Sequence, residues 1–358
     1  MINTIFEGDC IEGMRNIPDQ SVNCCVTSPP YFGLRDYGHE GQIGLEETPE
    51  QFVAKLVDVF REVKRVLKSD GTLWLNLGDS YAGSGKGANP DGSVHKSALN
   101  GKQGTHKGTT EGLKKPQKAH EIGLKQKDLI GIPWMVAFAL RADGWYLRQD
   151  IIWHKPNPMP ESVTDRCTKS HEYIFLLSKS QKYYYDHEAI KQPMAEVSAA
   201  RMDRGVSDDH KNINGAPGQT PHSLNAPRAN VKMKAVGGAK HKNLESNGQA
   251  NHSFHKTRNE KGEEWQSESG MANKRSVWTV TTKPYSEAHF ATYPPDLIVD
   301  CIKAGCPEGG IVLDPFMGAG TTALVSRKLH RQYVGFELNP EYIRIAKNRL
   351  QQELGMFV

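Results

Sequence analysis

Short apolar runs that alternate with segments of helical periodicity restrict the fold of this sequence more than any other feature. Four runs are almost continuously apolar, as is typical of strands that are buried on both faces. They are SVNCCVTS at 21–28, TLWLNLGDS at 72–80, GIVLDPF at 310–316 and QYVGFEL at 332–338. Helix-like segments stand between them, for example at 48–71, 129–144 and 321–330. This alternation predicts an α/β fold with a mostly parallel, doubly wound sheet.

The first helical segment has clear start and stop signals. Thr48 is a suitable N-cap, Pro49 suits the first helical position, and Gln51 stands where a capping-box partner is expected. Gly71 predicts where this helix ends. The segment therefore predicts one long amphipathic helix from 48 to about 70.

The middle and the end of the chain continue the pattern. Residues 145–155 predict a strand, and residues 171–180 with 182–186 predict a hairpin of two strands. Further helices are predicted over 295–306 and 339–354, on either side of the last two apolar runs. The alternation thus extends to the C-terminal part of the chain.

The composition indicates a soluble, globular protein. Charged residues make up 24% of the chain and hydrophobic residues 37%, and no run approaches the roughly 18 apolar residues of a membrane span. The N-terminus has no basic-then-apolar leader, so we expect a cytoplasmic protein without a membrane partner. Six cysteines without a Cys-x-x-Cys pair fit reduced thiols better than disulfides or a zinc site.

Positive charge is concentrated in two segments, although the formal net charge of the whole chain is only +4. Residues 84–127 hold nine lysines against three acidic residues, and residues 197–283 hold fourteen basic against eight acidic residues. Both are rich in Gly, Asn, Ser and Lys and lack apolar periodicity, which is typical of solvated loops. A polyanionic partner would be attracted by them and would order them.

A glycine-rich loop after a buried strand gives the first chemical signal. Gly318 and Gly320 follow an acidic strand end, and a helix opens directly afterwards at Thr321, which exposes free N–H groups to a ligand. Glu337 ends the following strand, where a carboxylate can accept hydrogen bonds from both ribose hydroxyls of a nucleoside. The layout predicts a nucleoside-containing cofactor.

Two other uses of such a loop fit less well. A nicotinamide dinucleotide fingerprint has a third glycine where this chain has Ala323, although alanine is sometimes allowed there. A phosphate-binding Walker loop requires Lys-Ser or Lys-Thr after the glycines, and this chain has Thr-Thr. A nicotinamide oxidoreductase stays an alternative at this point, as does a non-catalytic DNA-binding module suggested by the basic segments.

The motifs taken in order resemble one enzyme family. The series GDC, TSPPY, NLGD, WHKPNPMPES, ATYPPDLI, LDPFMGAGTT and GFEL resembles the β-group of S-adenosylmethionine-dependent DNA amino-methyltransferases, of N4-cytosine or N6-adenine type. The resemblance implies a class I methyltransferase (Rossmann-like) sheet of seven mostly parallel strands, circularly permuted, with the two basic segments inserted. It also implies S-adenosyl-L-methionine as the cofactor and no metal.

The same resemblance implies a division of the chain. Residues 1–194 form a catalytic half, with 84–127 as a basic insertion; residues 195–283 form a target recognition region; and residues 284–358 form the cofactor-binding half of the same catalytic domain. The expected partner is double-stranded DNA. A cognate restriction endonuclease is a second candidate partner, and monomer and homodimer both stay open.

The resemblance assigns the catalytic role to Ser28, Pro29, Pro30 and Tyr31. The exocyclic amine of a base is a poor nucleophile because its lone pair is delocalised into the ring. The Ser28 hydroxyl and the Pro29 carbonyl are acceptors that would draw the amine toward tetrahedral geometry and stabilise the charge that develops on it. Tyr31 would stack on the base, which must be extruded from the duplex to be reached.

Other roles are implied residue by residue. The cofactor-binding residues implied are Asp9, Tyr293, Pro294, Asp314, Pro315, Phe316, Gly318, Gly320, Thr321, Thr322 and Glu337. The target-base pocket implied consists of Trp153, Lys155 and Asn157. His171 and Glu172 could act as an acid and base pair, but because they open a predicted strand we interpret them as structural.

The reaction can be narrowed from the sequence. A C5-cytosine methyltransferase needs a cysteine nucleophile after proline, and no Pro-Cys occurs in this chain, which excludes that route. Serine rather than aspartate at the first position of the catalytic motif favours N4-cytosine, with N6-adenine as the alternative. RNA or small-molecule methylation is less favoured because a small substrate does not need long basic insertions.

The second basic segment lies where the family places target recognition. Its basic side chains, with nearby Asn and Gln, suit contacts with phosphates and base edges. The DNA-binding residues expected are Arg201, Arg204, Arg228, Lys232, Lys234, Arg258 and Arg275.

Overall fold

The computed structural model describes residues 2–33, 39, 41–82, 123–194, 271–283 and 293–355. The chain divides into two units, Met1–Ile190 with Lys274–Val358, and Lys191–Asn273. Most residues of the two predicted basic insertions lie outside the described residues. Residues 274–283, which we expected in the recognition region, belong to the first unit.

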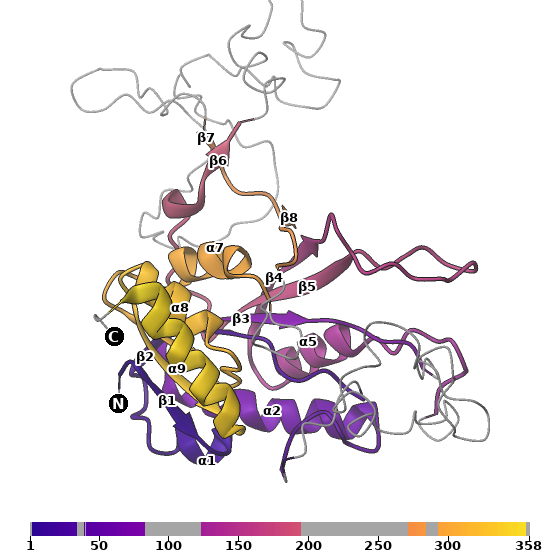
Figure 1. Ribbon diagram of the computed structural model, residues 1–358, viewed down its shortest axis with the longest axis horizontal. Helices are drawn as coiled ribbons and strands as arrows, with labels where there is room; N and C mark the ends of the chain where they lie inside the picture. The colour runs from indigo at the N-terminus through magenta and orange to yellow at the C-terminus, as the bar shows by residue number, and fades with distance from the viewer. Residues whose placement is uncertain are drawn as a thin grey trace, which may run out of the picture. The chain divides into compact units, whose positions relative to one another are not determined.

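An eight-stranded sheet forms the centre of the first unit, in the order β1-β10-β9-β2-β3-β5-β4-β8. Figure 1 labels six of these strands, β1 to β5 and β8. The strands are β1 (Thr4–Glu7), β2 (Val22–Thr27), β3 (Leu67–Leu77), β4 (Tyr146–His154), β5 (His171–Ser178), β8 (Val277–Thr279), β9 (Ile311–Asp314) and β10 (Gln332–Glu337). In this spatial order, each neighbouring pair from β1 through β10, β9 and β2 to β3 is parallel. β5 is antiparallel to both β3 and β4. The predicted α/β fold with a mostly parallel sheet is confirmed. The sheet has one strand more than the seven implied, because β8 pairs in parallel with β4 at its edge.

Helices cover both faces of this sheet. They are α1 (Cys10–Met14), α2 (Pro49–Val66), α5 (Ile132–Ala142), α7 (Pro295–Gly305), α8 (Thr321–Lys328) and α9 (Pro340–Leu354), with a 3-10 turn η2 (Glu188–Ile190). Side chains that alternate along the strands pack on opposite sides: Cys25 belongs to the core under α2 and α5, whereas Cys24 and Val26 belong to the core under α7. The strands are thus buried on both faces, as their continuous apolar sequences predict.

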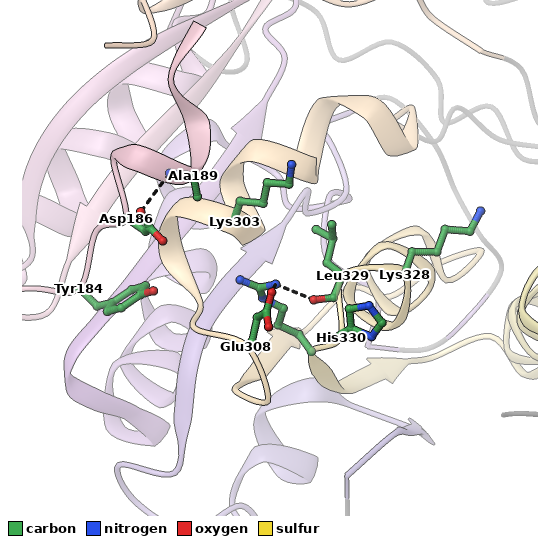
Figure 2. Close-up of a pocket in the computed structure, with 9 residues that line it drawn as sticks. Tyr184, Asp186, Ala189, Lys303, Glu308, Lys328, Leu329 and His330 are labelled. Carbon is green, nitrogen blue, oxygen red and sulfur yellow. Dashed lines mark hydrogen bonds and ion pairs between the residues drawn. The ribbon is translucent and has the colours of Figure 1, made fainter. Parts of the chain in front are cut away.

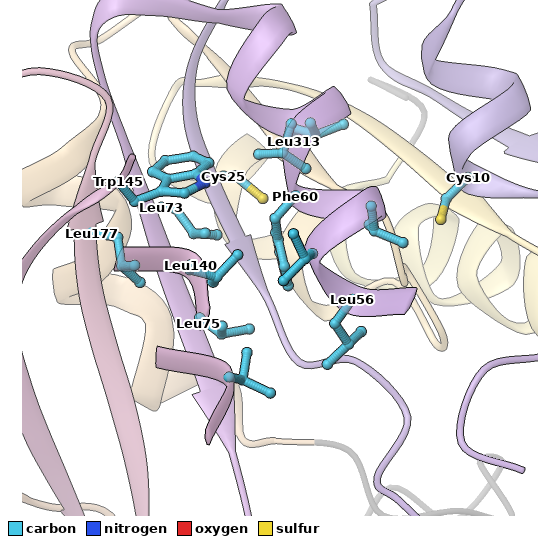
Figure 3. Packing of buried hydrophobic residues seen from close by; sticks show 14 of the residues in the cluster. Cys10, Cys25, Leu56, Phe60, Leu73, Leu75, Leu140, Trp145, Leu177 and Leu313 are labelled. Atoms are coloured by element: carbon cyan, nitrogen blue, oxygen red, sulfur yellow. The ribbon is translucent and has the colours of Figure 1, made fainter. Parts of the chain in front are cut away.

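The core between the sheet, α2 and α5 is built from large aliphatic and aromatic side chains (Figure 3). Leu56 and Phe60 from α2 and Leu140 from α5 are fully buried, and they face Leu73 and Leu75 of β3. A tightly packed layer of this kind holds the strand ends in fixed positions. The loops that follow those ends carry the candidate site.

The start of α2 agrees with its sequence signals, and its end does not. Thr48 Oγ1 accepts a hydrogen bond from the Gln51 amide at 3.2 Å, and Pro49 occupies the first turn. The helix ends at Val66 rather than near Gly71, so the predicted end is wrong. Leu67 already has extended backbone angles and begins β3, because the chain continues directly into the sheet beside β2.

The predicted hairpin of residues 171–180 with 182–186 is also wrong. β5 occupies the place between β3 and β4 and uses both of its edges there, so its hairpin partner is β4. Residues 182–186 form no strand. Instead the Tyr185 ring stacks on Trp74, with 6.2 Å between the ring centroids, and the Tyr184 amide donates to the Asp70 carbonyl at 2.9 Å.

The described part of the second unit is small. β6 (Gln192–Pro193) and β7 (Met271–Ala272) form an antiparallel pair there. Among the described residues of the whole chain, every helix is too short or too polar to cross a lipid bilayer. The same residues contain no group of three or more His, Cys, Asp or Glu side chains placed to hold a metal ion.

Candidate active site

A cavity of about 730 Å³ opens at one end of the sheet, and the residues that line it all belong to the first unit. The loops after β1, β2, β4, β9 and β10 reach it, so it lies at the carboxyl ends of parallel strands, the usual place for a ligand in an open α/β sheet. β5 runs in the opposite direction and therefore contributes a residue near its start, Glu172. The predicted site residues that line the cavity are Asp9, Ser28, Pro29, Pro30, Tyr31, Trp153, Lys155, Asn157, Tyr293, Pro315, Phe316, Gly318, Thr321 and Glu337.

The glycine loop between β9 and α8 has the backbone that its sequence predicts. Gly320 has φ +78°, and a Cβ atom there would lie 2.8 Å from Ala346 Cβ, so only glycine fits. α8 has no side-chain cap at its N-terminus, which leaves N–H groups open for a ligand. Thr321, its first residue, lines the cavity, and its hydroxyl accepts a hydrogen bond from buried Arg349 at 3.0 Å.

Glu337 is held rigidly at the end of β10. Its Oε2 accepts a hydrogen bond from the Gly318 amide at 2.8 Å, and its Oε1 accepts one from the Asn339 amide at 2.9 Å. Burial raises the pKa of this carboxyl, and the two amide hydrogen bonds oppose that effect. Each oxygen keeps a second lone pair, so the carboxylate can also accept hydrogen bonds from a ligand.

Asp9 has a local structural role beside the cavity. Its Oδ1 caps α1 by accepting hydrogen bonds from the Ile11 amide at 2.9 Å and the Glu12 amide at 3.0 Å. The carboxylate is thereby fixed where the chain leaves β1, next to the end of β10. This position is compatible with the implied contact to a cofactor and does not require it.

Asp314 is buried and does not line the cavity. Its side chain is 1% exposed, and its carboxylate accepts hydrogen bonds from Thr27 at 2.6 Å, from Thr322 at 2.6 Å and from the Tyr293 hydroxyl at 3.2 Å. Burial raises the pKa of Asp314, while these donors act in the opposite direction. The carboxylate thus anchors Tyr293, which does line the cavity. Three further residues expected at the cofactor, Pro294, Gly320 and Thr322, are also absent from the lining.

The residues of the expected catalytic motif follow β2 directly and line the same cavity. Pro29 is buried, whereas Ser28 and Pro30 are half-buried. The Tyr31 hydroxyl donates a hydrogen bond to Glu172 Oε2 at 2.7 Å, and burial together with this carboxylate raises its pKa well above the ordinary value. Tyr31 therefore stays a neutral hydrogen-bond donor at neutral pH.

The three residues expected at the target-base pocket all line the cavity, but their side chains have different hydrogen-bond partners. Trp153 is 3% exposed, and its indole N–H donates to the Val280 carbonyl at 2.8 Å. Asn157 exchanges two hydrogen bonds with the backbone of Thr282, at 3.0 and 3.3 Å, so its amide joins two loops. Lys155 places its ammonium 4.3 Å from the centroid of the Trp153 ring and forms an ion pair with Glu172.

Glu172 is a residue of the site that sequence reasoning interpreted as structural. It opens β5 as expected, yet its carboxylate lines the cavity and contacts both Tyr31 and Lys155. A charged residue at the start of a strand gives no local signal of this, because only the antiparallel direction of β5 places that start beside the carboxyl ends of the other strands. His171 is not among the lining residues, and its ring nitrogen lies 3.3 Å from the Tyr173 hydroxyl.

Of the seven expected DNA-binding residues, only Arg275 lies within the described residues. It is exposed just before β8, and its carbonyl accepts a hydrogen bond from the Trp278 indole at 2.8 Å. Arg201, Arg204, Arg228, Lys232, Lys234 and Arg258 lie outside the described residues.

A second hollow, of about 460 Å³, lies at the amino ends of β9 and β10 (Figure 2). Two of its basic groups have partners: Arg331 donates two hydrogen bonds to the Cys306 carbonyl, at 3.1 and 3.0 Å, and Lys328 pairs with Glu353 at 2.5 Å. The first contact joins the chain just before β10 to the end of α7, and the second joins α8 to α9. We therefore interpret this hollow as a structural junction.

This chain is similar in sequence to known DNA methyltransferases. A family model described as DNA methylase, of the N6/N4 methyltransferase type, matches residues 22–348. The Type II methyltransferase M.XycI from Xanthomonas campestris pv. cyanopsidis is 43% identical over 350 residues, which cover 98% of this chain and 88% of that protein.

Two solved structures share the fold. The PvuII DNA methyltransferase, titled cytosine-N4-specific, matches with a TM-score of 0.55 at 15% identity and covers 97% of this chain and 85% of its own. A putative DNA modification methylase from Thermus thermophilus, complexed with S-adenosyl-L-methionine, matches with a TM-score of 0.51 at 21% identity. The match covers 98% of this chain and 94% of that protein's chain.

Proposed function

This chain belongs to the N6/N4 DNA methylase family, and we propose that it methylates the exocyclic N4 amine of cytosine in DNA. Family membership makes it an S-adenosyl-L-methionine-dependent DNA methyltransferase of Type II. It also removes the two alternatives from other classes, the nicotinamide oxidoreductase and the non-catalytic DNA-binding module. The choice of cytosine N4 rests on Ser28 at the first position of the catalytic motif.

The residues that line the cavity fit the cofactor. S-adenosyl-L-methionine, when bound, supplies an electrophilic methyl group on a sulfonium. In this proposal Glu337 accepts hydrogen bonds from its ribose hydroxyls, because the two backbone amides fix the carboxylate and leave lone pairs open. The uncapped N-terminus of α8 suits the carboxylate of its methionine part.

The catalytic motif acts on the amine of the base. Ser28 Oγ and the Pro29 carbonyl oxygen accept hydrogen bonds from its two N–H groups, which localises the lone pair on nitrogen and stabilises the positive charge that develops there. The support for this assignment is that Ser28 and Pro29 line the same cavity as Glu337 and Phe316. N6-adenine methylation by the same groups is the second candidate, because a hydroxyl can accept from either amine.

The chemical identity of the methylated base tests this proposal. We expect N4-methylcytosine when DNA from a host without methylation is incubated with the protein and labelled cofactor, digested to nucleosides and analysed by mass spectrometry. N6-methyladenine as the labelled product would instead establish the alternative. Sequencing the same modified DNA would identify the recognition sequence.

We expect acidic pH to weaken the binding of S-adenosyl-L-methionine, because Glu337 then becomes protonated. Its pKa is raised above the ordinary 4.5 because the side chain is buried, so as pH falls it takes up a proton earlier than an exposed glutamate. The protonated group loses charge and acceptor capacity, and we expect the Kd for S-adenosyl-L-methionine to be constant near neutral pH and to rise as pH falls through the raised pKa. Equilibrium dialysis over a pH series measures this. Glu337→Gln should bind weakly at every pH, and a pH dependence unchanged in that variant would assign the effect to another group.

We further propose that residues 195–283 carry target recognition and that Arg275 contacts the DNA backbone. The support is the excess of basic over acidic residues in that segment. A cognate restriction endonuclease is the proposed biological partner, on the grounds that the relatives are Type II methyltransferases.

A further inference from the structure

Glu172 lines the cavity and connects three segments there: the catalytic motif after β2, strand β3 and the loop after β4. Its carboxylate accepts hydrogen bonds from Tyr31 in the catalytic motif at 2.7 Å and from Asn76 of β3 at 3.3 Å, and it forms an ion pair with Lys155 after β4. The side chains of Glu172 and Lys155 are only 15% and 19% exposed. All four residues line the cavity.

Stability alone does not explain such an ion pair. Removing two charges from water costs free energy that their attraction barely recovers, and an apolar pair of similar size is often as stable. Asn76 needs Glu172 least, because its amide also donates to the Tyr173 carbonyl at 3.1 Å. The two groups that depend on the carboxylate are therefore Tyr31 and Lys155.

Glu172 fixes the Tyr31 ring from one side, and the backbone fixes it from another. A Cβ atom at Gly78 would lie 2.5 Å from Tyr31 Cε2, so the ring packs directly on the Gly78 backbone. With its hydroxyl bound to Glu172, the ring has little freedom to rotate or tilt. Such a ring offers a preformed surface for a planar base.

The same carboxylate fixes the Lys155 ammonium above the Trp153 ring. An ammonium has three N–H donors, and within the described residues Glu172 is the group that accepts from it. Its other two donors have no acceptor among the described residues, and Lys155 lines the cavity. On the base-pairing edge of cytosine, the ring nitrogen N3 lies next to the carbon that carries the N4 amine, and the carbonyl oxygen O2 lies beyond N3; both are acceptors that match these donors.

We propose that Glu172 is a positioning residue: it holds the Tyr31 ring and the Lys155 ammonium in the positions from which both contact the extruded target base. The inference rests on the proposed function, since it assumes that a base enters this part of the cavity. Glu172 acts through its two partners and has no chemical step of its own. It was interpreted as structural from sequence, and the proposal replaces that interpretation.

Glu172→Gln tests this role, because the amide keeps the size of the side chain and an acceptor for Tyr31 but loses the charge that holds Lys155. We expect kcat/KM for DNA to fall about tenfold or more, as for the loss of a hydrogen bond between charged groups. The Kd for S-adenosyl-L-methionine and the thermal midpoint should stay close to those of the unchanged protein. Glu161→Gln is the matched control, because Glu161 pairs with Arg166 outside the cavity lining and should leave all three quantities unchanged.

Tyr31→Phe provides an independent test, and it keeps the proposal falsifiable if Glu172→Gln does not fold. Removing the hydroxyl should lower kcat/KM for DNA while cofactor binding is retained. Its effect should be somewhat smaller in the Glu172→Gln background, because the hydroxyl there bonds to a neutral amide instead of a carboxylate. Full activity of either single variant, or a parallel loss of cofactor affinity and thermal stability, would overturn the proposal. A failure of the proposed function would look different, because the unchanged protein would then form no N4-methylcytosine.

Discussion

Replacing Glu337 with alanine is expected to weaken the binding of S-adenosyl-L-methionine by about 100-fold or more. The proposed contacts are two hydrogen bonds from the ribose hydroxyls to a carboxylate, and each bond of this kind contributes about 1.5–3 kcal/mol. The substitution also removes the acceptor of the Gly318 amide, so the glycine loop loses one of its supports. Isothermal titration calorimetry of the protein without DNA measures the affinity directly.

Glu341→Ala is the control for this measurement. Glu341 is in the first turn of α9, close in sequence to Glu337, but its side chain is 62% exposed and pairs with Arg344 on the surface. Cofactor affinity should be unchanged there. If Glu337→Ala bound the cofactor as tightly as the unchanged protein, the ribose would have to be held elsewhere and the assignment of this end of the cavity would be wrong.

The parts of the site that could be predicted from sequence are those fixed by short stretches of chain. Glu337 and the glycine loop follow from the rule that ligand-binding groups stand at the carboxyl ends of parallel strands. Ser28 to Tyr31 follow a strand in the same way. Thr48 and Pro49 start a helix through contacts within one turn, so local sequence is sufficient.

The parts that could not be predicted depend on partners far away in the chain. The Tyr31 hydroxyl bonds to a residue 141 positions later, and the Asn157 amide is bound to a backbone segment 125 positions later. Asp314 was expected at the cofactor, yet Thr27, 287 positions earlier, is one of the donors that bind it below the cavity. Residue type and spacing cannot distinguish a carboxylate that faces a ligand from one that is satisfied by the protein.

The two errors in secondary structure have a common physical cause. Gly71 and residues 182–186 both carry local signals, a helix stop in one case and β-forming tyrosines in the other. In each case the sheet determines the outcome, because β3 begins at Leu67 beside β2 and β5 already has partners on both edges. Pairing within a sheet outweighs local preference.

Ser28→Ala is expected to lower kcat for methyl transfer by about 100-fold, with the Kd for S-adenosyl-L-methionine unchanged within about twofold. A group that bonds to the developing charge contributes mainly in the transition state, and removal of one such hydrogen bond typically costs 10²–10³ in kcat. Single-turnover transfer of labelled methyl groups to DNA measures the chemical step apart from product release. Ser69→Ala is the control, because Ser69 is exposed near the opposite end of the sheet, and its rate should equal that of the unchanged protein.

The size of this effect distinguishes two models of the catalytic motif. If the Pro29 carbonyl alone activated the amine, Ser28→Ala would transfer methyl groups at nearly the normal rate, and the serine would be only a strand-end residue. If Ser28 instead supported the cavity as a whole, its loss would lower cofactor affinity and kcat together. A selective loss of kcat is the result that assigns the hydroxyl to the amine of the base, because Ser28 follows β2, whereas the glycine loop and Glu337, which we propose to hold the cofactor, follow β9 and end β10.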